Sequence, residues 1–323
     1  MFSKETLNKI NTNDKILIVG DILLDQYIYG ESTRLSPEAP IPIFVPQKSS
    51  FRLGGAANVF NIVNALNGNA KLCGIVGNDL EGNCVKNYLS ELNEFGELII
   101  GCARPTTTKT RLICGKQHML RIDREEVHEI DSELENRIIE LIQDNINNYK
   151  VLILSDYHKG FLSYGLVKRV VKICNDNNVK ILVDAKKDFL KYKNSFLIKP
   201  NIKDLINIMG CSVHFDRNEL ILYCKKLLYK GNFKYIYVTL GENGGILIDE
   251  KNETNIRPFL NEFYVDATGA GDTAIAALSV ALAANLEIDD AMFFASYVAG
   301  ISITKNETNG VTKEDLLRYV RYI

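Results

Sequence analysis

The strongest constraint on the fold is a regular alternation between short apolar runs and longer segments with helical periodicity. A short, continuous apolar run predicts a buried parallel strand, because helices cover both faces of such a strand. The predicted strands are 15–20, 71–76, 151–154, 180–183, 196–198 and 235–239. The predicted helices are 56–66, 80–92, 132–146, 164–175 and 217–229. Strands and helices that alternate in this order form βαβ units, so we expect an α/β fold with helices on both faces of a parallel sheet.

Two stretches interrupt this alternation, near 26–48 and 105–123. Each contains short strand-like pieces, and the first also contains the turn-rich segment 34–40. Because both follow core elements as insertions, we expect a small β-layer that projects from the sheet. Such a layer would cover a pocket as a lid or pair with a second copy at its edge. Ordinary surface hairpins fit the pattern equally well.

Composition and charge indicate the broad class of the chain. The 323 residues have no composition break or internal repeat, so we expect one domain over 1–323. The net charge of −2, with no basic block, argues against nucleic acid or an anionic membrane as a partner. The seven cysteines form no CxxC pair, which is typical of reduced thiols. The polar segment 1–14 lacks the apolar core of a signal peptide, so a cytoplasmic location is expected.

A glycine-rich turn precedes the most apolar helix that the sequence predicts, 273–284. Gly269 and Gly271 bracket Ala270, where a strand-like run turns into this helix. Glycine permits positive φ and a close ligand, and free N–H groups at a helix N-terminus bind anions. The carboxylate of Asp272 is unfavourable in such an anion site unless it accepts a proton. The alternative is an ordinary turn in which Asp272 caps the helix.

Polar residues also follow several of the other predicted strands, where open parallel sheets bind their ligands. Gly54 and Gly55 would let a polyol approach the backbone, and Asn58 can both donate and accept hydrogen bonds. Asp21 and Asp25 could accept hydrogen bonds from sugar hydroxyls. Each of these residues alone is more often a cap or a solvated side chain, so the prediction depends on their convergence at one edge.

Three motifs together resemble the ribokinase (PfkB) family of sugar kinases. They are GGAAN at 54–58, TLGENGG at 239–245 and DATGAGD at 266–272, and the resemblance extends from about 15 to about 305. It implies a three-layer α/β/α fold with a mostly parallel sheet and a small β-lid. It further implies ATP and Mg²⁺ as cofactors and a homodimer paired through the lid. A P-loop kinase is excluded, because the chain contains no GxxxxGK[ST] motif.

A narrower resemblance comes from GDILLD at 20–25, RLSPEAPIP at 34–42, and PTTTKTR at 105–111 with LRIDRE at 120–125. These stretches are similar to the kinase part of ADP-heptose synthases, which phosphorylates D-glycero-D-manno-heptose 7-phosphate at the anomeric oxygen to give the 1,7-bisphosphate. The resemblance alone supplies this substrate. The alternatives are a fructokinase-like enzyme for another sugar and a non-catalytic sugar-binding regulator. The HxGH signature of the nucleotidyltransferase part is absent, so we expect a separate nucleotidyltransferase downstream.

The resemblance also assigns roles to residues of this chain. It implies that Asp272 is the catalytic base and that the backbone N–H groups of Gly269, Ala270 and Gly271 form an anion hole. The predicted ATP-binding residues are Asn201, Ile202, Lys203, Asp204, Thr239, Gly241 and Gly244. Asp204 replaces the glutamate of the family's NxxE element and would contact Mg²⁺ indirectly. The predicted substrate-binding residues are Asp21, Asp25, Gly54, Gly55, Asn58, Arg111 and Lys186, the last two for the 7-phosphate.

Overall fold

The computed structural model describes residues 15–91, 99–210, 216–256, 269–304 and 310–319. The predicted turn therefore enters the described part of the chain at Gly269, and 266–268 lie outside it. Within the described residues, the predicted alternation of strands and helices is confirmed, and two predicted strands have the observed bounds, Lys15–Gly20 and Tyr235–Thr239.

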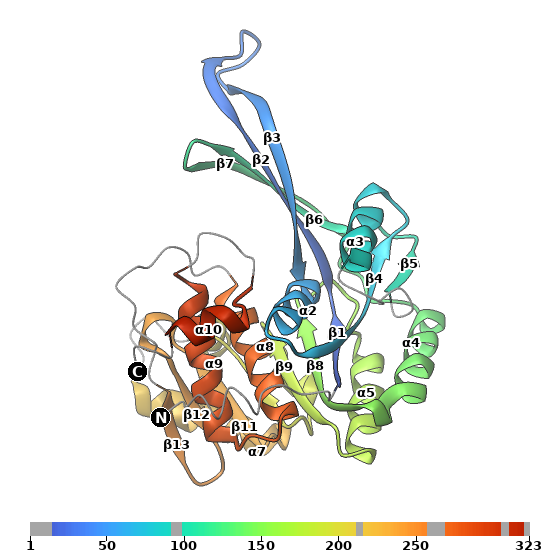
Figure 1. Cartoon of the computed structure of the whole chain (residues 1–323), viewed down its shortest axis with the longest axis vertical. Coiled ribbons are helices and arrows are strands. Elements are labelled where there is room, and N and C mark those ends of the chain that lie inside the picture. The colour runs from blue at the N-terminus through green and yellow to red at the C-terminus, as the bar shows by residue number, and fades with distance from the viewer. Residues whose placement is uncertain (1–14, 92–98, 211–215, 257–268, 305–309, 320–323) are drawn as a thin grey trace.

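The central sheet has nine strands (Figure 1). Their order across the sheet is β13 (Glu253–Ile256), β12 (Gly245–Ile248), β11 (Tyr235–Thr239), β10 (Leu197–Ile198), β9 (Lys180–Ala185), β8 (Tyr149–Asp156), β1 (Lys15–Gly20), β4 (Asn69–Gly77) and β5 (Ile99–Cys102). All neighbours from β11 to β5 run parallel, while the β11–β12 and β12–β13 pairs are antiparallel. The expectation of a mostly parallel sheet is thus confirmed.

Helices cover both faces of this sheet and create two hydrophobic cores. Successive residues of β1 alternate between them: Ile16 and Ile18 face one core, and Leu17 and Val19 the other. The first core lies under α2 (Ala56–Ala65), α3 (Leu80–Glu91), α8 (Ala270–Ala283), α9 (Ile288–Ser302) and α10 (Lys313–Tyr319). The second lies under α4 (Ser132–Asn145), α5 (Tyr164–Asp176), α6 (Ile202–Met209) and α7 (Arg217–Gly231). This is the expected three-layer α/β/α architecture.

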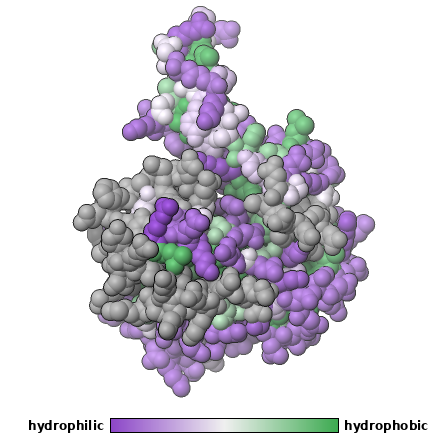
Figure 2. Space-filling view, in the orientation of Figure 1, coloured by the Kyte–Doolittle hydropathy of each residue, from purple (hydrophilic) through white to green (hydrophobic). Residues whose placement is uncertain are grey.

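A second sheet of four strands projects from the body as a lid (Figure 1). Its order is β3 (Pro42–Gly55), β2 (Ile22–Leu35), β6 (Thr107–Cys114) and β7 (Gln117–Arg124). The strands β2 and β3 are longer than the predicted pieces, so Asp25, Gly54 and Gly55 lie within lid strands. The sequence underestimated them because much of each strand is only half-buried and lacks a strong apolar pattern. Figure 2 shows apolar side chains among hydrophilic ones on this projecting part.

Helix α8 begins inside the glycine-rich turn. Its N-cap is Gly269, which has φ 82°, so Asp272 is the third residue of the helix. The alternative in which Asp272 caps the helix is therefore wrong. Every residue of α8 from Asp272 to Ala283 is buried. None of the helices in the described part of the chain combines the length and apolar content needed to cross a membrane.

Candidate active site

The carboxylate of Asp272 is held by donors from two other elements. Asn58 of α2 donates from Nδ2 to Oδ2 at 2.8 Å, and the hydroxyl of Tyr157, just after β8, donates to Oδ1 at 2.6 Å. Burial and the nearby carboxylate of Asp184 raise the pKa of Asp272, while the two hydrogen bonds and the ammonium of Lys186 oppose the rise. Each carboxylate oxygen retains a free lone-pair direction after one hydrogen bond. Asp272 is therefore an oriented carboxylate that can still accept a proton.

The turn in front of Asp272 lies between two polar side chains. A Cβ atom added at Gly269 would lie 3.6 Å from Nδ2 of Asn58, and one added at Gly271 would lie 3.4 Å from Nζ of Lys199. The N–H groups in the first turn of a helix have no acceptor within the helix. Together with the partial positive charge of the helix N-terminus, they favour an anion at Ala270 and Gly271.

A cluster of charges surrounds this turn at the carboxyl ends of β9 and β10. Nζ of Lys199 lies 3.1 Å from Oδ2 of Asp184, and both side chains are almost fully buried. Nζ of Lys186 lies 3.5 Å from Oδ1 of Asp184 and 5.3 Å from the ring centre of Tyr157. Asp184, ahead of burial, is the main influence on Lys186 and raises the pKa of its ammonium. The site thus presents two ammonium groups, both paired with Asp184, beside the N-terminus of α8.

The acidic residues of this cluster fit a magnesium ion. Both oxygens of Asp184 and Oδ2 of Asp204 are buried and accept no hydrogen bond from the described residues. Burial is the main cause that raises the pKa of Asp204, and Lys186 opposes it. Among the residues that the structure describes, no group of three or more His, Cys, Asp or Glu side chains could hold a metal ion. One or two carboxylates completed by water and phosphate oxygens are typical of Mg²⁺ sites in kinases.

The residues predicted to bind the nucleotide are adjacent in the fold. Asn201 caps α6 by accepting a hydrogen bond from the backbone N of Asp204 at 2.8 Å, and it forms a parallel bridge with Thr239 at the end of β11. Gly241 (φ 63°) and Gly244 (φ 77°) form the turn that links β11 to β12. Ile202 and Lys203 lie in the first turn of α6. The two segments thus form one edge of the site beside Asp184 and Lys186.

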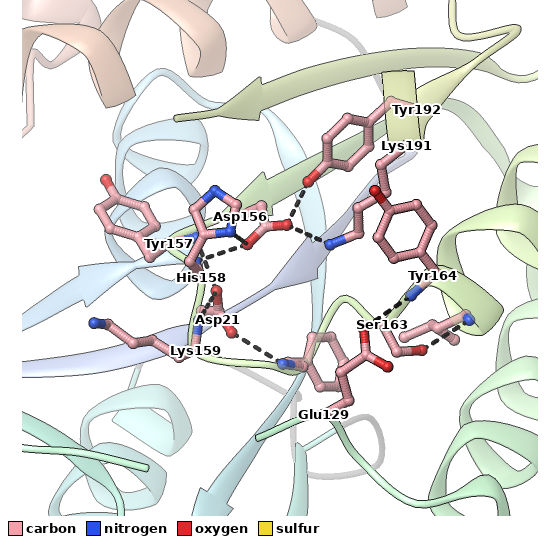
Figure 3. A network of polar contacts seen from close by, with 12 residues as sticks. Asp21, Glu129, Asp156, Tyr157, His158, Lys159, Ser163, Tyr164, Lys191 and Tyr192 are labelled. Carbon is pink, nitrogen blue, oxygen red and sulfur yellow. Dashed lines mark hydrogen bonds and ion pairs between the residues drawn. The ribbon is translucent and has the colours of Figure 1, made fainter. Parts of the chain in front are cut away.

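The predicted sugar-binding residues lie in two places, in the body of the protein and in the lid. Asn58 lies at Asp272, whereas the buried carboxylate of Asp21 accepts hydrogen bonds from the backbone of 157–161 (Figure 3). In the lid, Oδ1 of Asp25 pairs with Nη1 of Arg111 at 2.6 Å. Gly54 and Gly55 are required by close packing, because a Cβ atom there would approach Asp25 Oδ2 to 2.5 Å and the Asp21 carbonyl oxygen to 2.3 Å, respectively.

Three residues of the site are absent from the predicted set: Tyr157, Asp184 and Lys199. All three stand at or just after the carboxyl end of a core strand. The rule that open parallel sheets bind ligands at the carboxyl ends of their strands points to Asp184 in β9. For Tyr157 and Lys199 the same rule, applied to β8 and β10, was the available signal.

Comparisons with known proteins show which family the chain is similar to. The model of the "pfkB family carbohydrate kinase" matches residues 13–315. A bifunctional protein HldE of Aliarcobacter butzleri is 36% identical over 312 residues, which cover 96% of this chain and 65% of that protein. A bifunctional protein HldE of Helicobacter hepaticus is 35% identical, over 95% of this chain and 64% of that protein. The chain therefore spans less than two thirds of the length of each of these relatives.

Solved structures share the fold at lower sequence identity. Ribokinase of Arabidopsis thaliana, complexed with ribose and ATP, aligns with a TM-score of 0.76 at 16% identity, covering 97% of this chain and 100% of that chain. Phosphofructokinase-2 of Escherichia coli, in complex with potassium, aligns with a TM-score of 0.77 at 16% identity, covering 96% of this chain and 99% of that chain. At this identity the likeness extends to the fold alone.

Proposed function

The chain belongs to the pfkB family of carbohydrate kinases, and we propose that it transfers the γ-phosphate of ATP to the anomeric hydroxyl of D-glycero-D-manno-heptose 7-phosphate. The observation that carries the proposal is the oriented carboxylate of Asp272 at the N-terminus of α8. The sugar is taken from the resemblance of the lid motifs at 34–42 and 105–125 to heptose 7-phosphate kinases. The similarity to part of the HldE proteins supports the same choice.

The chemistry that we assign to the site is a proton transfer combined with stabilisation of charge. Asp272 accepts the proton of the anomeric hydroxyl as the hydroxyl oxygen bonds to the γ-phosphorus, while the bond from this phosphorus to the bridging oxygen breaks and ADP leaves. A positioned base contributes about 10²–10⁴-fold to the rate. The N–H groups of Gly269, Ala270 and Gly271 stabilise the transferring phosphoryl group, at roughly 3 kcal/mol for one such donor. Lys186 and Lys199 add positive charge beside them. When bound, Mg²⁺ would neutralise part of the negative charge on the phosphates, and Asp204 and Asp184 would hold it.

The substrate phosphate is assigned to the base of the lid. Asp25 is close enough to Tyr157 to influence its pKa, so the lid pair of Asp25 and Arg111 continues outward from Asp272 and Tyr157. Burial and then the ammonium of Lys159 lower the pKa of Lys109. A phosphate dianion between Lys109 and Lys159 would relieve the repulsion between their ammonium groups. Lys186, by contrast, faces Asp184 and Asp272, so we assign it to the transferred phosphoryl group instead of the 7-phosphate.

Two further proposals concern the nucleotide and the partners. ATP would lie along 201–204 and the turn at Thr239, Gly241 and Gly244, and its use agrees with the cytoplasmic location that the sequence predicts.

A second copy would pair through the lid, where apolar side chains are more than half exposed: Leu35, Ile41, Val45 and Leu120. The product would be adenylylated by a nucleotidyltransferase.

An ADP-release assay tests the substrate. With ATP and Mg²⁺, we expect heptose 7-phosphate to give a higher kcat/KM than fructose, fructose 6-phosphate or ribose. A preference for an unphosphorylated sugar would overturn the heptose assignment and favour the fructokinase-like alternative.

The assigned phosphate subsite has its own test. Lys109→Met should raise the KM for the sugar phosphate about tenfold or more, because a charge-assisted hydrogen bond is lost, and should leave the KM for ATP unchanged. Lys116→Met, an exposed lysine in the turn between β6 and β7, is the matched control. Equal KM values in both variants would place the 7-phosphate elsewhere.

A further inference from the structure

The segment 157–161, which follows β8, is fixed by two buried carboxylates (Figure 3). Asp21 follows β1 and Asp156 ends β8, and these strands are parallel neighbours in which Gly20 pairs with Ser155. Asp21 and Asp156 are only 2% and 1% exposed, respectively. Two carboxylates are therefore buried side by side, which is unfavourable unless each is well compensated.

The backbone of the segment supplies much of the compensation. The carboxylate of Asp21 accepts hydrogen bonds from the N–H groups of Tyr157 at 2.8 Å, Lys159 at 3.1 Å and Phe161 at 3.3 Å. Oδ1 of Asp156 accepts one from the N–H group of His158 at 2.7 Å. Burial and the neighbouring Asp156 raise the pKa of Asp21 to about 6. Both carboxylates therefore bind the backbone of the segment.

Two further side chains secure Asp156 from the opposite side. Its Oδ2 accepts hydrogen bonds from Nζ of Lys191 at 2.8 Å and from the hydroxyl of Tyr192. Although burial opposes it, the ammonium of Lys191 and these bonds hold the pKa of Asp156 below its ordinary value. The ion pair is itself almost fully buried.

The segment needs this support because its backbone is unusual. His158 has φ 57° and Gly160 has φ 83°, and the left-handed region is costly for a residue with a side chain. A Cβ atom at Gly160 would lie 2.0 Å from the carbonyl oxygen of His128, so only glycine fits. Strained backbone persists where the surroundings over-determine it, and it is concentrated at functional sites.

The functional consequence lies with Tyr157, whose hydroxyl donates to Asp272 at 2.6 Å. Burial and then the carboxylate of Asp272 raise the pKa of Tyr157 well above its ordinary value, so the phenol remains a donor throughout the working pH range. We propose that Tyr157 is a positioning residue for Asp272 and that Asp156 and Asp21 act through it, by fixing the backbone that presents its hydroxyl. This inference rests on the proposed role of Asp272 as the base.

A pH profile separates this role from a merely structural one. Among the described residues, the groups that face Asp272 are Tyr157 after β8, Asp184 and Lys186 at the end of β9, and Asn58 of α2, with Lys199 after β10 beside the preceding turn. The hydrogen bond from Tyr157 favours the ionised carboxylate. Its loss in Tyr157→Phe should therefore move the acid limb of kcat/KM to higher pH by about one unit or more. At pH values below the midpoint of the wild-type profile, the activity of Tyr157→Phe should be about tenfold lower than that of the wild type. This loss should shrink as the pH rises.

The matched control for this variant is Tyr164→Phe, a tyrosine that is 58% exposed at the start of α5. The control should keep the wild-type profile. An equal loss at every pH in Tyr157→Phe, or no loss, would overturn the proposal.

A double-mutant cycle tests whether Asp156 acts through Tyr157. Asp156→Asn should shift the acid limb in the same direction, and Tyr157→Phe with Asp156→Asn should lose no more than about twofold beyond Tyr157→Phe alone. Additive losses would overturn the role of Asp156. If Asp156→Asn does not fold, Tyr192→Phe removes one of its donors and is read in the same cycle. Asp176→Asn, at an exposed i,i+4 pair with Lys172, is the control.

Asp272→Asn in the same assay separates the proposed base role of Asp272 from the positioning role of Tyr157. Retained turnover in Asp272→Asn would overturn the proposed base and, with it, this inference. Lost turnover in Asp272→Asn with an unshifted Tyr157→Phe profile would overturn the inference alone.

Discussion

Two pairs of buried carboxylates lie close together in this protein, and their oxygens are hydrogen-bonded to different degrees. In the first pair, Asp21 and Asp156, every oxygen accepts at least one hydrogen bond from backbone N–H groups or from Lys191 and Tyr192. In the second pair, neither oxygen of Asp184 accepts a hydrogen bond from the described residues, and Asp272 accepts one on each oxygen. We call the first the closed pair and the second the open pair.

The difference indicates which pair faces a ligand. The closed pair is bonded mainly to the segment 157–161 and to Lys191 and Tyr192. The open pair has lone-pair directions to spare and two ammonium groups beside it. Among the described residues, the oxygens of Asp184 are compensated by ion pairs with Lys186 and Lys199 instead of by hydrogen bonds, so they can still accept a hydrogen bond or bind a cation.

The largest expected effect is on turnover, at the open pair. Asp272→Asn keeps the shape of the side chain but removes the proton acceptor, so kcat should fall by about 10²–10⁴-fold while the Kd for ATP is unchanged. Steady-state kinetics and calorimetric nucleotide binding measure the two quantities. Asp289→Asn, at an exposed position in the first turn of α9, should behave as wild type. Turnover in Asp272→Asn close to that of this control would remove Asp272 from the role of base.

The next effect is on stability and compares the cations of the two pairs. Lys199→Met leaves the buried Asp184 without its nearer cation and should lower the free energy of unfolding by about 3–5 kcal/mol. Lys191→Met should cost less, because Asp156 keeps its bonds from His158 and Tyr192. Urea denaturation of both variants measures the difference, with the exposed Lys193→Met as the control. A larger cost for Lys191→Met would break the contrast between the open and the closed pair.

The smallest effect is a shift in pH dependence. Burial and Asp184 raise the pKa of Asp272 above 3.8, so activity should fall as the pH drops through that raised value and the base becomes protonated. Lys186 favours the ionised carboxylate, so Lys186→Met should move this acid limb to still higher pH, by a fraction of a unit to about one unit. Lys193→Met, at an exposed lysine, should leave the limb in place. The kcat/KM profiles of both variants decide, and an unshifted limb in Lys186→Met would contradict this influence of Lys186 on Asp272.

Much of the fold follows from the sequence because burial on both faces leaves a local pattern. A strand such as Lys15–Gly20 must be apolar at every position to contact two cores, and the helices between strands must be apolar along one side. The start of α8 is also encoded locally, since Gly269 can adopt the positive φ of its N-cap. The half-exposed lid strands leave no such pattern, so their full length was not predictable.

The contacts of the site were decided by the tertiary structure. Asp21 follows a core strand, as the sequence indicates, but its carboxylate bonds the backbone of residues more than 130 positions away. Tyr157 reaches Asp272 across 115 positions, and Asn58 reaches it across 214. A parallel sheet brings the ends of strands together whatever their separation along the chain, and the register of β1 against β8 sets where Asp21 meets the segment after β8. The sequence by itself therefore determined the sheet and the glycine-rich turn, while only the packing of distant strand ends decided which carboxylates are closed and which remain open.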